Sequence, residues 1–304
     1  MRLGVIHRSS LIMNNITFIG IGAPRSGTSW IANVLRTHPH ICISEPKEVR
    51  YFNRHEVQAG KLKGKINPNF DQDLSWYMRR FSHAKPGQLL GEISPVYLSD
   101  TEAPEAIKTN FPDIKLIVCL RNPVDRAFSL YNLHRGNSLI DDISFETALE
   151  QERVYVESGM YAKHLERYLQ YFNSNQILFL IFEEFIANPD KGFAQIYNFL
   201  GVDSNVNNDF SSFDTNASSK RRSTKLHKFA FRFSQWLINV RLSVILTSLR
   251  SIGAHKLFRS INAAPAKKDK VRDLTRNNLV ELFREDIIKL EKMFNKDIRK
   301  WWNL

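Results

Sequence analysis

Nearly continuous apolar runs along the chain alternate with amphipathic stretches. Five short runs have the pattern of strands buried on both faces of a sheet: residues 16–22, 40–44, 89–94, 115–121 and 176–182. Apolar residues recur at helical spacing in other segments: residues 29–39, 123–136, 144–152, 160–172 and 189–201. This alternation predicts an α/β fold of P-loop-like, three-layer architecture, in which a central, mainly parallel sheet is flanked by helices.

The remaining segments set the predicted domain organisation. Residues 1–14 are predicted to be an N-terminal extension, because Arg8 divides apolar runs that are too short for a secretory signal. Residues 15–304 are predicted to form one domain. Residues 203–219 are rich in Ser, Asn, Asp and Thr and are typical of a loop. A final helix is predicted over residues 274–302, with an apolar stripe that packs onto the body.

Composition and charge narrow the class of protein. The 304 residues are 43% hydrophobic and 24% charged, which is typical of a globular protein and excludes disordered and disulfide-scaffold classes. The net charge of +12 is concentrated in residues 220–272, which contain fourteen Lys and Arg but only one acidic residue, Asp269. The rest of the chain is close to neutral. The distribution predicts a basic helical segment that faces an anion, and no specific nucleic-acid partner is expected.

The cysteines and the apolar runs bear on the cellular setting. Cys42 and Cys119 lie in strand-like runs and are expected to be buried, reduced thiols. The longest apolar candidates near the basic segment are interrupted by Arg241 and Arg250, well short of the about 20 residues that cross a membrane. A cytoplasmic protein is therefore expected. No His/Cys spacing indicates zinc, and no metal site is expected.

The segment GAPRSGTS, residues 22–29, carries the most informative chemistry. Between a buried strand and a helix, such a loop directs backbone N–H groups and the positive end of the helix dipole at one point, which suits phosphate. Gly27 permits close approach of the backbone, and Arg25 adds a positive fork. Hydroxyl donors come from Ser26, Thr28 and Ser29. A tight turn without a ligand is the alternative, but it does not require so many donors.

Two other function classes remain as alternatives. The spacing from Gly22 to Gly27 matches the GxxxxGK[ST] loop of nucleotide kinases, but Thr28 stands where that loop has Lys. The strand over residues 115–121 also ends in Arg121 instead of an acid that could hold Mg²⁺. A P-loop nucleotide kinase is thus the second hypothesis. A non-enzymatic module that binds anions or membranes through the aromatic and cationic residues of 220–272 is the third.

Three segments resemble sulfotransferases that use 3′-phosphoadenosine 5′-phosphosulfate (PAPS). GAPRSGTSWIANVLRTHP with KEVRYFN is similar to their 5′-phosphosulfate-binding region, and IKLIVCLRNPVDRAFSLY to their 3′-phosphate-binding motif. The likeness is to the carbohydrate, heparan-sulfate-type branch and its bacterial relatives, and it extends from about residue 16 to 302. It implies sulfuryl transfer from PAPS to a hydroxyl or amine, with adenosine 3′,5′-bisphosphate as product and no metal. A glycan is the expected acceptor, and a small polar metabolite is the other.

The resemblance assigns residues to the cofactor. Arg121 and Ser129 pair on the 3′-phosphate, and Ser129 lies about two turns into the helix that Pro123 begins. The alternative interpretation is that Arg121 is a solvated arginine at the end of a strand and Ser129 a serine on the helix surface. The other implied cofactor contacts are Arg25, Ser26, Gly27, Thr28, Ser29, Trp30, Lys220, Arg221 and Arg222. The family commonly has Lys in place of Arg25; Arg keeps the charge but differs in geometry.

The resemblance also assigns the catalytic residues. Glu48 is expected to be the base that takes the proton of the acceptor, and Lys47 to stabilise the bridging oxygen. Arg25 and its loop are expected to stabilise the leaving phosphate. From the residues alone, a surface ion pair of Glu48 with Lys47 or Arg50 is the competing interpretation.

Two further residues are assigned to the substrate side. Glu92, in GEISPVYL, is expected to be a second base or an acceptor contact, or else to make a strand-end hydrogen bond. Tyr161, in a Gly-x-Tyr that begins at Gly159, shapes the site or packs a helix. The charges of residues 220–272 exceed what PAPS requires, so an anionic acceptor, a membrane surface or a partner is expected there.

Overall fold

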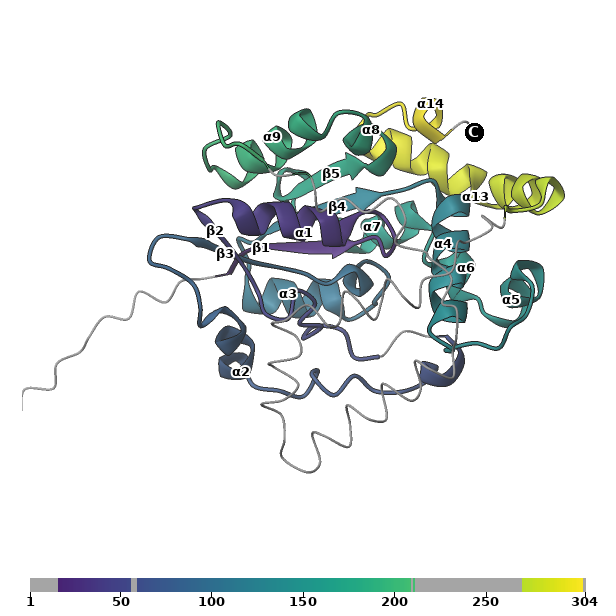
Figure 1. The fold of residues 1–304 in the computed structure, drawn as a ribbon, viewed down its shortest axis with the longest axis horizontal. Helices are drawn as coiled ribbons and strands as arrows, with labels where there is room; N and C mark the ends of the chain where they lie inside the picture. The colour runs from purple at the N-terminus through teal and green to yellow at the C-terminus, as the bar shows by residue number, and fades with distance from the viewer. Residues whose placement is uncertain (1–15, 56–58, 209, 211–269, 303–304) are drawn as a thin grey trace, which may run out of the picture.

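The computed structural model describes residues 16–55, 59–208, 210 and 270–302 (Figure 1). The predicted N-terminal extension lies outside these ranges, as do most of the basic segment and its residues Lys220, Arg221 and Arg222. Among the described residues, no helix is both long and apolar enough to span a membrane.

All five predicted strands are confirmed, and they form one parallel sheet. They are β1 (Ile16–Gly22), β2 (Ile41–Ile43), β3 (Leu89–Ile93), β4 (Lys115–Leu120) and β5 (Ile177–Ile181), in the order β2-β3-β1-β4-β5. After β1 the chain adds strands on one side, and with β4 it continues on the other side. Ligands of open α/β sheets bind at the carboxyl ends of the strands at such a switch point. The segments after β1 and β4 therefore lie side by side where a ligand is expected.

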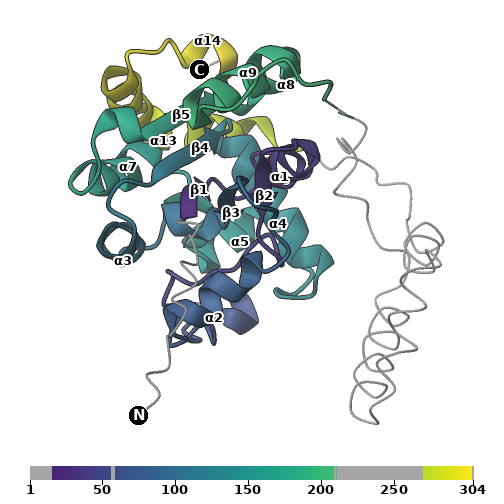
Figure 2. The same ribbon diagram turned by 90° about the vertical axis from the view of Figure 1, so that its left-hand side faces the viewer.

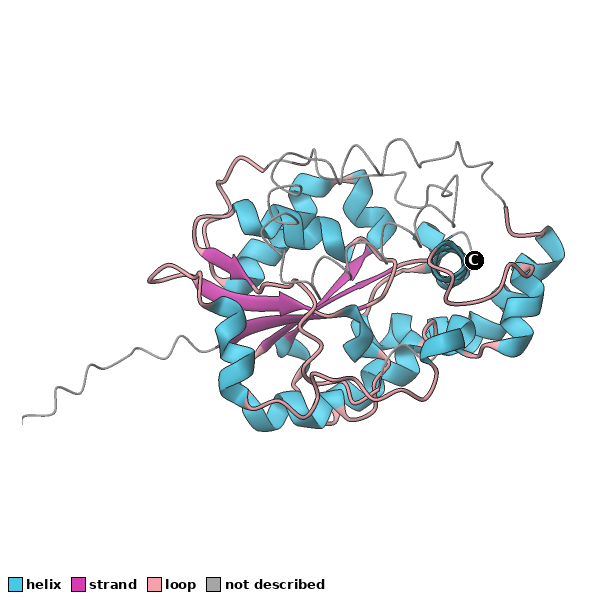
Figure 3. Cartoon of the chain, turned by 60° about the horizontal axis from the view of Figure 1, so that its bottom comes forward, coloured by secondary structure: helices cyan, strands magenta, loops and turns pink. Residues whose placement is uncertain are grey.

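Helices cover both faces of the sheet (Figure 3). One face carries α1 (Thr28–Thr37), α8 (Phe182–Ala187) and α9 (Pro189–Leu200). The other face carries α3 (Ala103–Asn110), α4 (Pro123–Gly136) and α7 (Tyr161–Leu169). The shorter elements are η1 (Gly60–Leu62), α2 (Leu74–Met78), η2 (Arg79–Phe81), η3 (Pro95–Leu98), α5 (Phe145–Gln151), α6 (Val154–Glu157) and η4 (Ser174–Gln176). The five helices predicted between the strands and after β5 are confirmed, and the α/β architecture with them.

The C-terminal helix is broken, which corrects the single helix predicted over residues 274–302. Helix α13 (Asp273–Phe294) ends where Asn295 adopts a left-handed conformation with φ 48°, which Asn tolerates. The Glu291 carboxylate then accepts hydrogen bonds from the N–H groups of Ile298 and Arg299, at 2.9 and 3.0 Å. The chain resumes as α14 (Arg299–Trp302) beside α8, while α13 packs on α7 and α4 (Figure 2).

Both cysteines are buried and carry free thiols, as predicted. Cys42 lies in β2 and Cys119 in β4, so each side chain belongs to the packed faces of the sheet. Burial raises the pKa of the Cys119 thiol, which keeps it protonated and unreactive. Their role is packing.

Asp286 ties the C-terminal helix to α7, and its loss is expected to destabilise the fold. This buried carboxylate accepts hydrogen bonds from the N–H groups of Ala162 (2.9 Å) and Lys163 (3.1 Å), which cap the start of α7. Asp286→Ala leaves both donors unpaired and should lower the free energy of unfolding by about 1–3 kcal/mol in urea titrations. Glu285→Ala, at the exposed neighbouring position, should change it little; equal losses in the two variants would contradict this role.

Candidate active site

The loop between β1 and α1 has the geometry of an anion site. Arg25 and Gly27 both adopt left-handed conformations, with φ of 73° and 76°. A Cβ at Gly27 would lie 2.8 Å from the ring of Phe182, so only glycine fits there without displacement. Gly27 occupies the N-cap position of α1 and has no side chain to pair with the first helical N–H groups. These donors are therefore available to an anion at the positive end of the helix.

The hydroxyl groups of the loop differ in their surroundings. Ser26 is fully buried, and within the described part of the chain its Oγ has no hydrogen-bond partner. A buried hydroxyl without a partner is costly, and the oxygens of a bound phosphosulfate would pair with it. Thr28 is buried at the start of α1, and Ser29 is exposed beside it. The donor set of the loop thus fits the 5′ end of the expected cofactor.

Trp30 was expected to contact the cofactor, but its side chain lies in the core. Its ring packs edge-to-face on Phe185 and Phe193, with centroid separations of 5.1 and 5.4 Å. The indole therefore fixes α1 against α8 and α9. Only the backbone of Trp30 remains for the nucleotide.

The structure brings the two predicted phosphate motifs into direct contact. Nε of Arg25 donates to Oγ of Ser129 on α4, at 3.0 Å. Nη1 of Arg121, which follows β4, donates to the carbonyl oxygen of Arg25 at 3.2 Å. Tyr161 is fully buried, and its hydroxyl donates to the carbonyl oxygen of Arg121 at 2.8 Å. Tyr161 thus fixes the backbone of the 3′-phosphate motif and does not face an acceptor.

The electrostatics of this region favour an anion. Burial lowers the pKa of Arg25, and the positive charge of Arg121 lowers it further. Across the described ranges, neither guanidinium forms an ion pair with a carboxylate. Two neighbouring, partly buried cations repel each other, and an anion bound between them would relieve this repulsion. Phosphate groups are the oxyanions that arginine forks bind best.

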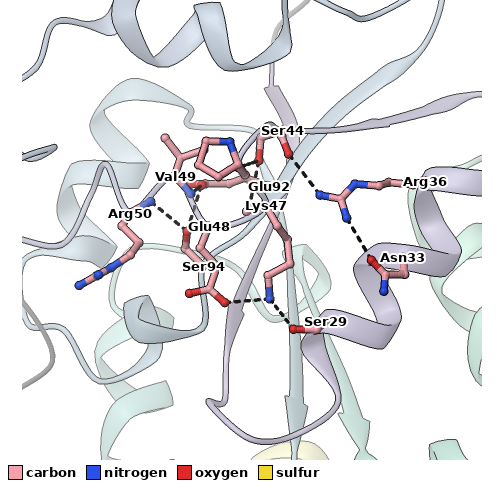
Figure 4. A network of polar contacts seen from close by, with 11 residues as sticks. Ser29, Asn33, Arg36, Ser44, Lys47, Glu48, Val49, Arg50, Glu92 and Ser94 are labelled. Atoms are coloured by element: carbon pink, nitrogen blue, oxygen red, sulfur yellow. Dashed lines mark hydrogen bonds and ion pairs between the residues drawn. The ribbon is translucent and has the colours of Figure 1, made fainter. Parts of the chain in front are cut away.

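Lys47 and Glu48 lie beside Ser29, at the end of the same loop (Figure 4). Nζ of Lys47 is 2.9 Å from Oε1 of Glu48 and donates to Oγ of Ser29 at 3.2 Å. The Lys47 side chain is 13% exposed and that of Glu48 41%. Burial lowers the pKa of Lys47, and the carboxylate of Glu48 opposes this shift. The ion pair that the sequence allowed is present, but it lies against the start of α1 and not on an open surface.

Glu92 is enclosed within the protein. Its carboxylate is fully buried and accepts hydrogen bonds from the Val49 N–H (3.2 Å), the Ser94 hydroxyl (3.1 Å) and the Tyr97 hydroxyl (2.8 Å). Burial raises its pKa to about 7, although these donors act in the opposite direction. The structure therefore shows the strand-end hydrogen bonding that was the alternative for Glu92, and no path from its carboxylate to an acceptor.

Sequence reasoning missed a second polar cluster beside Arg121. The Asn122 side chain caps α4 at the N–H of Val124 (3.0 Å) and donates to the carbonyl oxygen of Trp302 (2.9 Å). Glu183 accepts from the Asn122 N–H (3.1 Å) and from the Trp302 indole N–H (2.8 Å). Asn followed by Pro signals a helix start, but its long-range partners are visible only in the fold.

Comparisons with known proteins agree with this geometry. Residues 17–233 match the family model described as the sulfotransferase domain, so the chain belongs to that family. It is 31% identical over 192 residues to human heparan sulfate glucosamine 3-O-sulfotransferase 3B1, covering 60% of this chain and 45% of the relative. It is 30% identical over 207 residues to human bifunctional heparan sulfate N-deacetylase/N-sulfotransferase 2, covering 61% of this chain and 22% of the relative.

A solved structure shares the fold over most of the chain. The crystal structure of a sulfotransferase from Alicyclobacillus acidocaldarius superposes with a TM-score of 0.68 at 24% identity, covering 94% of this chain and 98% of that one. By contrast, the alignments span less than half the length of the curated human relatives. The α/β sulfotransferase fold is thus shown, and the activity follows as a proposal.

Proposed function

We propose that this protein transfers a sulfuryl group from PAPS to a hydroxyl or amine of a glycan, with a small polar metabolite as the other acceptor class. The observation that carries the proposal is that one loop, residues 22–29, contacts the residues assigned to both ends of the cofactor. Arg25 of this loop contacts both Ser129 and Arg121. Ser29 of the loop contacts Lys47, which pairs with Glu48. The glycan acceptor rests on the similarity to the heparan sulfate sulfotransferases.

The residues divide between the two phosphates of the nucleotide. The N–H groups at the start of α1, the buried Ser26 hydroxyl and the Lys47 ammonium suit the 5′-phosphosulfate. Arg121 and Ser129 suit the 3′-phosphate, and Arg25 lies between the two groups. PAPS supplies the sulfuryl group when bound and leaves as adenosine 3′,5′-bisphosphate.

Glu48 and Lys47 have complementary tasks in the transfer. The acceptor oxygen or nitrogen forms its bond to sulfur as the bond from sulfur to the bridging phosphate oxygen breaks, and the Glu48 carboxylate takes the acceptor proton. The electron pair of the broken bond remains on the phosphate oxygen. Lys47 and the loop amides stabilise that charge without having to move, because they already surround the start of α1.

A thermal-shift comparison separates sulfotransferase from kinase. Adenosine 3′,5′-bisphosphate at 100 times its Kd should stabilise the protein by about 2.7 kcal/mol and raise Tm accordingly. Mg-ATP should leave Tm nearly unchanged, because Thr28 replaces the lysine of a triphosphate loop. Adenosine 5′-phosphate serves as the control without a 3′-phosphate. A larger shift with Mg-ATP than with adenosine 3′,5′-bisphosphate would favour the kinase.

The basic segment of residues 220–272 supports a second contact. Its charge exceeds that of the three residues Lys220, Arg221 and Arg222 proposed to bind the nucleotide. The remaining cations suit an anionic acceptor or an anionic membrane surface. Sedimentation with vesicles that contain phosphatidylserine, compared with neutral vesicles, tests the membrane surface. Co-sedimentation with the anionic vesicles alone supports it. Absence of binding to either kind of vesicle argues for the anionic acceptor.

A further inference from the structure

The segment that carries Glu48 has no regular secondary structure, and its N–H groups pair with side chains. The N–H of Val49 donates to Glu92 at 3.2 Å, and that of Arg50 to the Ser94 hydroxyl at 3.0 Å. The N–H groups of the next two residues, 51 and 52, both donate to the Tyr97 hydroxyl, at 2.7 and 3.3 Å. Four consecutive amides are thus held by three side chains.

These three side chains, Glu92, Ser94 and Tyr97, are fully buried and bonded to one another (Figure 4 shows the first two). Both hydroxyls donate to the Glu92 carboxylate, at 3.1 Å from Ser94 and 2.8 Å from Tyr97. They come from the end of β3 and from η3, and the Ser94 N–H also bonds to the carbonyl oxygen of Gly20 in β1, at 2.9 Å. The unit is therefore anchored to the strand that leads into the phosphate loop.

The opposite side of the segment is held by the loop around residue 68. The Asn69 side-chain amide donates to the carbonyl oxygen of Val49 at 2.9 Å, and the Asn67 side-chain amide donates to that of Arg50. Arg50 has a left-handed backbone with φ 57°. A non-glycine residue keeps such a conformation only where its surroundings determine it strongly. The backbone next to Glu48 is therefore set by tertiary hydrogen bonds.

We infer that Glu92, Ser94 and Tyr97 form a positioning unit for Glu48, holding the backbone of residues 49–52 so that the Glu48 carboxylate and Lys47 meet the start of α1. The inference rests on the proposed function. Glu48 itself is 41% exposed, and within the described residues its carboxylate pairs with Lys47. Its location is thus governed by the backbone beside it. A displacement of about 1 Å in a reacting group costs on the order of 100-fold in rate.

Two substitutions test the unit. Tyr97→Phe removes the acceptor of two N–H groups, and Ser94→Ala removes the acceptor of the Arg50 N–H in a smaller change. Turnover is measured with radiolabelled PAPS and an N-sulfated heparan oligosaccharide, and amide hydrogen exchange is measured on peptides that cover residues 47–53. We expect kcat to fall by about 10- to 100-fold in Tyr97→Phe. The KM for PAPS should stay within about twofold, and amides 49–52 should exchange faster.

Tyr168→Phe is the matched control. Tyr168 is equally buried, and its hydroxyl donates to the carbonyl oxygen of Tyr97 at 2.9 Å and not to residues 47–52. We expect this variant to lose thermal stability but to keep kcat and the exchange rates of amides 49–52. A purely structural role of Tyr97 would lower kcat in both tyrosine variants in proportion to their loss in Tm.

The outcomes separate this inference from the proposed function. If the wild type transfers the sulfuryl group but Tyr97→Phe and Ser94→Ala keep the wild-type kcat, the positioning unit is refuted and the proposed sulfotransferase function stands. If the wild type transfers no sulfuryl group, the proposed function fails, and the exchange data still decide whether the unit holds the backbone of residues 49–52. Unchanged exchange of amides 49–52 in both variants would overturn it.

Discussion

Glu48→Gln is expected to lower kcat by about 100- to 10,000-fold while leaving the affinity for adenosine 3′,5′-bisphosphate nearly unchanged. The glutamine amide has the shape of the carboxylate but cannot accept the acceptor proton. The loop and the arginines proposed to bind the nucleotide should stay in place, because Glu48 bonds to neither Arg25 nor Arg121 in the described part of the chain. Steady-state turnover and calorimetric titration of the nucleotide measure the two quantities on the same preparation.

Glu102→Gln is the control for this prediction. Its carboxylate is 44% exposed and pairs with Arg54 at 3.7 Å, so it matches Glu48 in exposure and in having a cationic partner. It should leave kcat unchanged. A wild-type kcat in Glu48→Gln would remove Glu48 from the mechanism, and a parallel loss of nucleotide affinity would show that the ion pair with Lys47 serves binding instead.

Arg121→Ala is expected to lower the affinity for adenosine 3′,5′-bisphosphate by about 10- to 100-fold, the range of charge-assisted hydrogen bonds. The loss should be specific for the 3′-phosphate, so the affinity for adenosine 5′-phosphate should change little. Arg121 also donates to the carbonyl oxygen of Arg25, and a small shift of the loop accompanies its removal. Titration with both nucleotides measures the ratio that separates the two contributions.

Arg135→Ala provides the matched control, on the helix that follows Arg121. This arginine lies at the far end of α4, over the ring of Tyr131 and 3.9 Å from Asp142. Its removal lowers the net charge as Arg121→Ala does, without touching the loop. Equal losses of affinity in both variants would mean that general attraction by positive charge, and not a 3′-phosphate site, explains the binding.

The sequence predicted the elements well because each is determined by local periodicity. Residues 116–120 are apolar throughout, which is typical of a strand covered on both faces, and β4 begins and ends within a residue of the predicted range 115–121. The break at Asn295 was missed, because the apolar stripe continues across it to Ile298. The break depends on Glu291, whose carboxylate bonds to backbone N–H groups beyond the helix end.

The candidate site could be predicted as far as its residues lie in local motifs. Arg25 and Gly27 lie in the loop that joins β1 to α1, and this loop has the predicted form. The resemblance paired Ser129 with Arg121, and the contact of Ser129 with Arg25, which spans 104 positions, was not predicted. The sequence left two roles open for Glu92, because its bond to the Val49 N–H spans 43 positions and is visible only in the fold. Carboxylates that catalyse and carboxylates that position look alike in sequence.

Incubation of the purified protein with radiolabelled PAPS and a panel of heparan-type glycans, amines and small hydroxyl compounds tests the central claim most directly. We predict transfer of the label to at least one acceptor, with adenosine 3′,5′-bisphosphate formed in equal amount and with loss of transfer in Glu48→Gln. Recovery of the label only in PAPS and free sulfate with every acceptor, from a protein that binds the nucleotide, would contradict it.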